Sequence, residues 1–306
     1  MNPIYEMLAG CVGEEQIRIS EPMSRHTTFR IGGPADWFVM PRDAAQIGAV
    51  IAGCRDMGIP WFVLGNGSNL LVSDTGYRGV VIQIYKNMDR FSVAGTTLRA
   101  SAGALLSSLA AAARDAELTG MEFASGIPGT LGGAVYMNAG AYGGEMKDIL
   151  RTVTVLDAEN RIRQVDAGEL EMGYRTSCVK TKKWIVLEAE IELCPGNRDA
   201  ITEKMEELKE KRTAKQPLNY PSAGSTFKRP EGLFAGKLIM DAGLAGASVN
   251  DAQISEKHCG FLINRGAASA EDVWKLMMHV RAVVKEQFGV LLEPEVRLLG
   301  DFPEQE

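Results

Sequence analysis

The spacing of apolar residues changes between helical and strand-like several times in the first hundred residues, which predicts mixed helices and strands. Residues 1–20 fit a short helical lead-in. A helix is predicted to start after Asp43, a residue type that caps helices, and to end at Gly58. Two further apolar runs, at residues 61–64 and 80–85, predict strands, and the first of them is expected to be buried.

Helical and strand-like spacings of apolar residues continue through the rest of the chain. Residues 104–116 are rich in alanine and predict a helix. Residues 151–157 and 161–165 predict the two strands of a hairpin. Apolar and acidic residues alternate at 184–193, which predicts a half-buried strand, and a second period-two pattern predicts a final strand at 290–299.

A turn at residues 195–197, Pro-Gly-Asn, precedes a highly charged helix at 199–214, and a domain boundary is predicted there. A chain of 306 residues is expected to form about two domains. The resulting division has two earlier blocks, residues 1–85 and 86–196, and a C-terminal block, residues 197–306.

The composition is that of an ordinary globular protein, with 45% hydrophobic and 24% charged residues. The net charge is −6 and no basic stripe is present, so neither a nucleic-acid partner nor attachment to an anionic membrane is predicted. Five scattered cysteines without a C-x-x-C pair predict free thiols in a reducing cytosol, and three dispersed histidines predict no metal site. The N-terminus lacks a signal-peptide pattern, so a cytoplasmic location is expected.

Residues 123–144 form an uncharged stretch with seven glycines. Its length suggests a membrane span, but the glycines and Pro128 would weaken a lone helix and expose its backbone to lipid. Glycine instead lets another group approach the backbone closely, and uncharged surroundings suit a large, flat, mostly apolar ligand. On composition alone, the stretch is either such a ligand site or a run of tight turns.

A second glycine-rich turn, Gly-Asn-Gly-Ser-Asn at residues 65–69, follows the apolar run directly. A strand that enters such a turn can present several backbone N–H groups to a phosphate. Position 70 is leucine, so the turn is not the dinucleotide-binding fingerprint G-x-G-x-x-G. A plain turn is the alternative interpretation.

Three cations surround one serine in the loop at residues 215–230. Lys215 begins the loop, Lys228 and Arg229 lie near its end, and Ser225 lies between them. The other residues of the loop are mostly turn formers.

The order of five motifs identifies a family resemblance. They are LGNGSNLL (64–71), SGIPGTLGGAVYMNAGAYG (125–143), GYRTS (173–177), AGSTFKRP (223–230) and LEPEVRLLG (292–300). In this order, across nearly the whole chain, they resemble the UDP-N-acetylenolpyruvoylglucosamine reductase family. The family consists of flavoenzymes that complete the muramic acid precursor of peptidoglycan, which links them to cell-wall synthesis, cell shape and cell division.

The resemblance implies an α+β fold in which an FAD-binding domain of the PCMH, or vanillyl-alcohol-oxidase, type precedes an α+β substrate-binding domain. Residues 1–85 and 86–196 would be the two FAD-binding subdomains, and residues 197–306 the substrate domain. FAD would be bound without a covalent link. The residues implied to contact it are Leu64, Gly65, Asn66, Gly67, Ser68, Asn69, Leu70, Ser125, Gly126, Ile127, Gly129, Thr130, Gly133, Asn138, Gly140 and Ala141.

The implied reaction uses NADPH to reduce FAD, and the reduced flavin then passes a hydride to the enolpyruvyl group of a UDP-linked amino sugar. Arg175 is the implied cation for the substrate carboxylate, and a protonated Glu295 would donate a hydrogen bond to the same group. Ser225 would deliver the proton. The implied substrate-binding residues are Lys215, Lys228, Arg229 and Tyr174.

Two features separate this chain from some members of the family. No room exists between Arg175 and Lys215 for the inserted loop whose tyrosine closes over the substrate, so the chain resembles the shorter class. Arg229 stands where the loop-bearing members have asparagine. Partners other than the two substrates are not implied, and a monomer or weak dimer is expected.

Two other functions remain open at this point. One is an FAD oxidase of the same fold that acts on a small alcohol or sugar. Many such oxidases attach the flavin to an early histidine, and His26, the only early histidine here, lies well before the phosphate-binding turn. The other is a non-catalytic cofactor-binding or interaction module.

Overall fold

A computed structural model of the chain describes residues 2–303, which fall into two compact units. The first unit takes in most of residues 2–212, and the second unit combines residues 213–303 with two early segments, 19–36 and 67–78. This division differs from the one expected from the sequence. Both expected FAD-binding subdomains lie mainly in the first unit, but these early segments group with the C-terminal residues.

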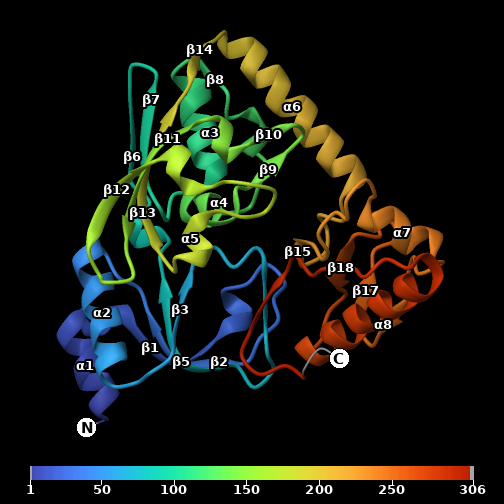
Figure 1. Cartoon of the computed structure of the whole chain (residues 1–306), viewed down its shortest axis with the longest axis horizontal. Coiled ribbons are helices and arrows are strands. Elements are labelled where there is room, and N and C mark those ends of the chain that lie inside the picture. The colour runs from blue at the N-terminus through green and yellow to red at the C-terminus, as the bar shows by residue number, and fades with distance from the viewer. Residues whose placement is uncertain (1, 304–306) are drawn as a thin grey trace. The chain divides into compact units, whose positions relative to one another are not determined.

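A four-stranded sheet has the strand order β1-β2-β5-β3. The strands are β1 (Ile17–Pro22), β2 (Pro34–Val39), β3 (Trp61–Leu64) and β5 (Tyr77–Gln83). Strands β3 and β5 are parallel, with Trp61 opposite Val80. Helices α1 (Pro3–Cys11) and α2 (Ala44–Asp56) pack against each other, as Figure 1 shows. Asp43 caps α2 as predicted, because its Oδ1 accepts a hydrogen bond from Gln46 N at 2.8 Å.

The first unit also holds a five-stranded antiparallel sheet in the order β12-β11-β13-β7-β6. Its strands are β6 (Phe91–Ala94), β7 (Thr97–Ser101), β11 (Leu150–Leu156), β12 (Ile162–Asp166) and β13 (Ile185–Glu192). Helix α4 (Leu131–Met137) contacts β7 and β13, and α3 (Leu106–Asp115) lies beside β6 and β8. Apolar side chains of these helices and of both sheets form one continuous core.

The remaining helices and strands complete the first unit. They are β8 (Leu118–Thr119), β9 (Gly140–Ala141), β10 (Gly144–Glu145), α5 (Cys178–Thr181), β14 (Cys194–Pro195) and α6 (Arg198–Lys215), whose last residues belong to the second unit. Single 3₁₀ turns occur at Glu14–Gln16, Met23–Arg25, Lys86–Met88, Glu122–Ala124, Met146–Asp148 and Ala167–Leu170.

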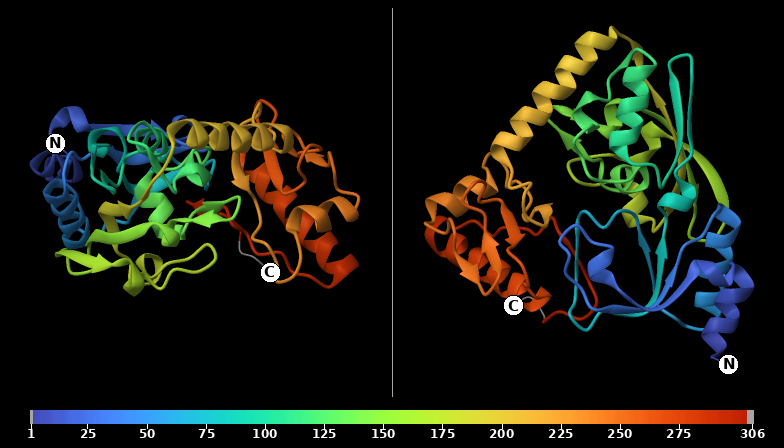
Figure 2. Two further views of the ribbon diagram at one scale, coloured as in Figure 1. Left: turned by 90° about the horizontal axis from the view of Figure 1, so that it is seen from above. Right: turned by 180° about the vertical axis from the view of Figure 1, so that it is seen from behind.

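The second unit is built on a four-stranded antiparallel sheet in the order β15-β18-β17-β16. Its elements are β15 (Ser222–Ser225), α7 (Ala235–Asp241), β16 (Ser248–Val249), β17 (Ala252–Ile254), β18 (Phe261–Asn264) and α8 (Ala270–Phe288). Helix α8 contacts β16, β17 and α7. Its ribbon is the long orange-red helix in both views of Figure 2. The early segments belong here because Phe29, Ile31 and Leu71 are part of its core. In addition, β4 (Leu70–Val72) pairs in parallel with β19 (Arg297–Leu299).

The predicted strand at 290–299 is wrong in its extent, because only Arg297–Leu299 is a strand. Pro294 lacks an N–H group and cannot continue a regular ladder. Residues 293–295 instead make irregular backbone hydrogen bonds with residues 226–228. The hairpin predicted at 151–165 is confirmed by β11 and β12.

The glycine-rich stretch at 123–144 is more than a run of turns. It contains most of a 3₁₀ turn, the helix α4, strand β9 and the start of β10. Among residues 2–303, no helix is long and apolar enough to cross a membrane.

Candidate active site

The first part of the Gly-Asn-Gly-Ser-Asn turn packs against the glycine-rich stretch within the first unit. A Cβ added to Gly65 would lie only 2.4 Å from Oγ1 of Thr130. Asn66 Nδ2 donates a hydrogen bond to the carbonyl oxygen of Pro128 at 2.7 Å. The two segments expected to contact FAD are therefore in direct contact with each other.

The second part of the turn belongs to the second unit. Gly67 has φ +64°, and a Cβ there would lie 2.0 Å from the carbonyl oxygen of His26. Within residues 2–303, the backbone N–H groups of Gly67, Ser68 and Asn69 have no hydrogen-bond partner. Adjacent N–H groups that the protein leaves unused are suited to bind a phosphate.

Helix α4 does not offer an anion site at its start. The N–H groups of Leu131 and Gly132 donate to the carbonyl oxygens of Ala104 and Ala102, both at 2.8 Å. Thr130 is the N-cap, and its Oγ1 accepts from Gly133 N at 3.4 Å. A ligand beside this segment would thus meet the loop before α4 rather than the helix terminus.

Asn138 ends α4 in a left-handed conformation, with φ +46°, and its side chain is fully buried. Its Nδ2 donates to Glu145 Oε2 at 2.5 Å and to Gly173 O at 3.0 Å, and its Oδ1 accepts from Lys147 N at 3.0 Å. These contacts give Asn138 a structural role. It fastens the β9–β10 hairpin to the turn that carries the predicted catalytic arginine.

Arg175 lies at the tip of that turn, between Gly173 and Thr176, which bond to each other through both backbone groups. Its φ is +54°, a conformation that costs a residue with a Cβ about 1 kcal/mol. Its Nη2 donates to Gly140 O at 3.3 Å, and its guanidinium lies 5.2 Å from the ring centre of Tyr174. Strained backbone of this kind is common at functional sites.

The segments that carry Ser225 and Glu295 pair with each other in the second unit. Ser225 ends β15, and the carbonyl oxygen of the next residue, Thr226, accepts from Glu295 N at 2.8 Å. A bridge between Phe227 and Pro294 continues this pairing. The Asn69 side chain donates to the carbonyl oxygen of Glu295 at 3.1 Å, so the predicted phosphate-binding turn is joined to the same segment.

The three predicted substrate cations have different surroundings in the second unit. Lys228 forms an ion pair with Glu293, and Lys228 N also donates to Glu293 O at 2.8 Å. Arg229 lies over the ring of Phe234, 4.6 Å from its centre. Burial and, to a smaller extent, the charge of Lys215 lower the pKa of His258.

Comparison with known proteins places these residues in a family. A model described as UDP-N-acetylenolpyruvoylglucosamine reductase, C-terminal domain, matches residues 216–299, and an FAD binding domain matches residues 35–166. The UDP-N-acetylenolpyruvoylglucosamine reductase of Lachnoclostridium phytofermentans is 52% identical over 98% of both chains. The protein of that name from Clostridioides difficile is 49% identical over 97% of this chain and 98% of its own. The chain belongs to the UDP-N-acetylenolpyruvoylglucosamine reductase family.

The solved structure of the Thermus caldophilus UDP-N-acetylenolpyruvylglucosamine reductase is similar to this chain, with a TM-score of 0.80 and 35% identity. The similarity covers 93% of this chain and 98% of the Thermus caldophilus chain. The predictions of the family and of an FAD-binding fold with a C-terminal domain are confirmed. As a family member with an FAD-binding domain, the chain is an FAD-dependent oxidoreductase with NADPH as its reductant.

The oxidase alternative has less support. The glucose dehydrogenase Phl p 4.0202 is similar over 63% of this chain, with a TM-score of 0.50 and 16% identity, which shows a shared fold alone. His26, the only early histidine, places its Nε2 2.9 Å from Glu21 Oε1 in the second unit.

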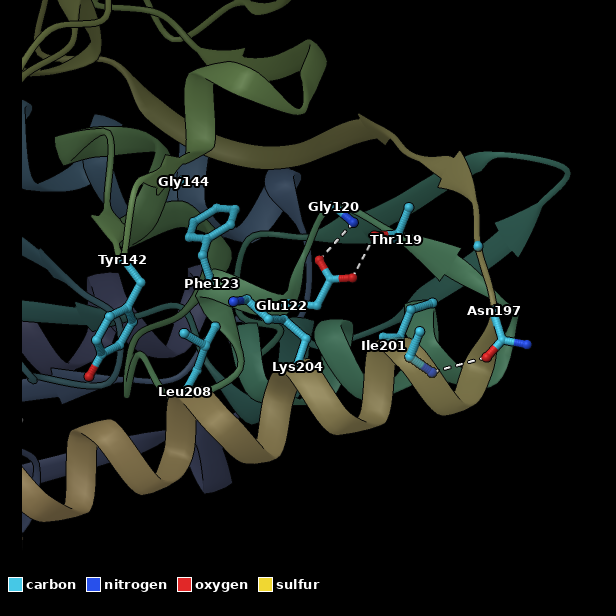
Figure 3. A pocket seen from close by; sticks show the side chains of 12 residues that line it. Thr119, Gly120, Glu122, Phe123, Tyr142, Gly144, Asn197, Ile201, Lys204 and Leu208 are labelled. Carbon is cyan, nitrogen blue, oxygen red and sulfur yellow. Dashed lines mark hydrogen bonds between the residues drawn. The ribbon is translucent and has the colours of Figure 1, made fainter.

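Sequence reasoning missed Arg212, on α6. Its guanidinium lies against Gly126, since a Cβ there would be 2.9 Å from Nη1, and burial lowers the pKa of the arginine. No signal in the sequence distinguishes it, because α6 is charged on nearly every side. The helix also closes a pocket of about 460 Å³ in the first unit, lined by Phe123, Tyr142 and Lys204 among others (Figure 3). None of the predicted site residues lines this pocket.

Proposed function

We propose that the chain uses NADPH to reduce the enolpyruvyl group of UDP-N-acetyl-3-O-(1-carboxyvinyl)-glucosamine to UDP-N-acetylmuramate, a peptidoglycan precursor. The relatives that cover nearly the whole chain carry the name of this activity. The backbone bond between Thr226 and Glu295 is the observation that supports the proposal, because it pairs the residue after Ser225, the proposed proton donor, with Glu295 in one unit. The chain acts in the cytoplasm, as a monomer or weak dimer.

The residues present fit FAD. The unused N–H groups of Gly67, Ser68 and Asn69 suit its pyrophosphate. Backbone N–H groups can bind an anion even though the net charge of the chain is negative. Gly65 lets the turn lie against Thr130, so the two segments proposed to contact FAD pack side by side. When bound, FAD supplies hydride transfer from NADPH to the sugar nucleotide. The remaining residues proposed to line it are those predicted from the family motifs.

Three side chains of this chain complete the reduction. Once the terminal methylene carbon of the substrate has received the hydride, the neighbouring carbon carries a negative charge that spreads into the carboxylate. Arg175, a permanent cation, stabilises that charge, and Glu295, held protonated, donates a hydrogen bond to the same carboxylate. Ser225 gives its hydroxyl proton to the neighbouring carbon.

Lys215, Lys228, Arg229 and Tyr174 are the proposed contacts to the substrate. The ion pair with Glu293 offsets the charge of Lys228, so Lys215 and Arg229 carry most of the attraction for the diphosphate.

The two half-reactions test the role of Ser225. In Ser225→Ala, flavin reduction by NADPH should stay close to the wild-type rate, because that step needs no proton on the sugar carbon. Reoxidation by the enolpyruvyl sugar nucleotide should slow by roughly 10²- to 10⁴-fold, the range of a lost general acid. Both rates are measured from flavin absorbance by anaerobic stopped flow.

Ser222→Ala is the matched control, since Ser222 begins the same strand β15. It should leave both half-reactions unchanged. Equal losses in the two half-reactions of Ser225→Ala would make Ser225 a structural residue. A purified wild-type protein that takes up no FAD would end the proposal itself.

A further inference from the structure

Phe234 occupies a position where a phenylalanine side chain does not favour folding. Its side chain is on the surface, and the residue is 57% exposed. It is also the N-cap of α7, where it makes no side-chain capping bond. Serine, threonine, aspartate or asparagine would stabilise the helix at that position by about 1 kcal/mol. Local choices that disfavour folding are expected at functional positions.

The ring of Phe234 supports Arg229. The guanidinium lies 4.6 Å from the ring centre, which is within the range of a cation–π contact. Both residues are held by backbone contacts. Next to Arg229, Lys228 N bonds to Glu293 O, and the carbonyl oxygen of Phe234 accepts from Lys237 N and Leu238 N at the start of α7.

The loop between them is a tight turn, which keeps the two side chains on one side. Leu233 N donates to Pro230 O at 3.1 Å, and Gly232 has φ +70°, as a turn with positive φ at its third residue requires. The turn therefore sets the backbone positions from which the two side chains meet.

A cation–π contact engages the face of a guanidinium, whereas a phosphate is bound by the N–H groups at its edge. That edge matches two oxygens of a phosphate. We propose that Phe234 is a positioning residue, which holds Arg229 for the diphosphate of the sugar nucleotide. This inference rests on the proposed function and names one binding group of the same site.

Removal of the ring should weaken binding and leave the chemical step alone. Phe234→Ala removes the cation–π contact to Arg229, so KM for the sugar nucleotide should rise by about 3- to 10-fold, with kcat within twofold of wild type. Phe234→Trp keeps an aromatic face and should restore the wild-type KM. Leu233→Ala, the exposed neighbour, should change neither constant.

Two further measurements separate positioning from direct contact. Inhibition by UDP should weaken in Phe234→Ala, and inhibition by uridine should not, because only UDP carries a diphosphate. Once Arg229→Ala is in place, Phe234→Ala should add no further rise in KM.

The inference is overturned if Phe234→Ala behaves like Leu233→Ala. It is also overturned if UDP and uridine weaken equally, since Phe234 would then contact the base. The inference is overturned as well if the rises in KM caused by Arg229→Ala and Phe234→Ala add up in the double variant. If the wild-type enzyme binds FAD but does not oxidise NADPH with the sugar nucleotide, the proposed function fails instead, and the two failures are distinct.

Discussion

Gly65→Ala tests the contact between the two glycine-rich segments. The new Cβ would lie 2.4 Å from Thr130 Oγ1, whereas a Cβ normally keeps more than 3 Å from other heavy atoms. The φ of Gly65 lies outside the left-handed region, so alanine causes no backbone strain there. The substitution therefore destabilises the folded state through the steric clash and not through backbone strain.

The size of the effect follows from what must move. Thr130 is 2% exposed and is the N-cap of α4, and loss of such a cap costs about 1 kcal/mol. If Thr130 keeps its place, the backbone of the turn must shift instead, which costs about 1–3 kcal/mol in a packed region. We expect Gly65→Ala to lower the free energy of unfolding by about 1–3 kcal/mol.

Urea denaturation and the ratio of flavin to protein absorbance measure the two consequences. The displaced turn should also retain less FAD after gel filtration. Gly168→Ala is the control, because nothing lies within 4 Å of the added Cβ and the φ of Gly168 is also outside the left-handed region. Its denaturation midpoint should stay within the equivalent of about 0.5 kcal/mol of wild type.

The double variant Gly65→Ala/Thr130→Ala decides whether the clash is the cause. Thr130→Ala removes the hydroxyl that the new Cβ meets, so the double variant should be more stable than the sum of the single effects by about 1–2 kcal/mol. Strict additivity, or a Gly65→Ala variant as stable as Gly168→Ala, would refute this account of the contact.

Three further outcomes concern single contacts. Asp74→Ala removes the carboxylate that accepts from Ala270 N at 2.8 Å and Glu271 N at 2.9 Å at the start of α8, so its urea midpoint should fall by the equivalent of about 1–3 kcal/mol. Asn138→Ala loosens the Arg175 turn, and stopped flow should show a larger loss in flavin reoxidation than in flavin reduction. Burial lowers the pKa of His258, so the unfolded chain takes up that proton first as pH falls below about 6.5, and stability falls with it. Urea midpoints at pH 7 and pH 5 should differ less in His258→Gln than in wild type.

Elements with a strong local signal could be predicted from the sequence. The cap at Asp43 and the hairpin of β11 and β12 depend on neighbouring residues, and the structure confirms both. The family and the FAD-binding fold could be predicted because their motifs keep a fixed order, and the comparisons confirm them.

Long-range pairing could not be predicted. No periodicity in residues 67–78 indicates that β4 pairs in parallel with β19 near the end of the chain. The period-two pattern at 290–299 was misleading. Alternation of apolar and polar side chains gives no information on the backbone, where Pro294 lacks the N–H group that a strand needs. The division into units follows from such pairings and not from composition at the predicted boundaries.

The proposed catalytic residues lie on or next to irregular backbone. Arg175 has a positive φ, Ser225 follows a register shift between Ser222 and Ser225, and Glu295 follows a proline. Regular strands and helices repeat one conformation, whereas a site with several roles needs side chains aimed individually. Buried polar groups hold this irregular backbone, as when Thr226 Oγ1 accepts from Leu262 N at 3.1 Å. Motifs therefore identify these residues better than periodicity does, because their identity is set by the reaction and their backbone by contacts remote in the sequence.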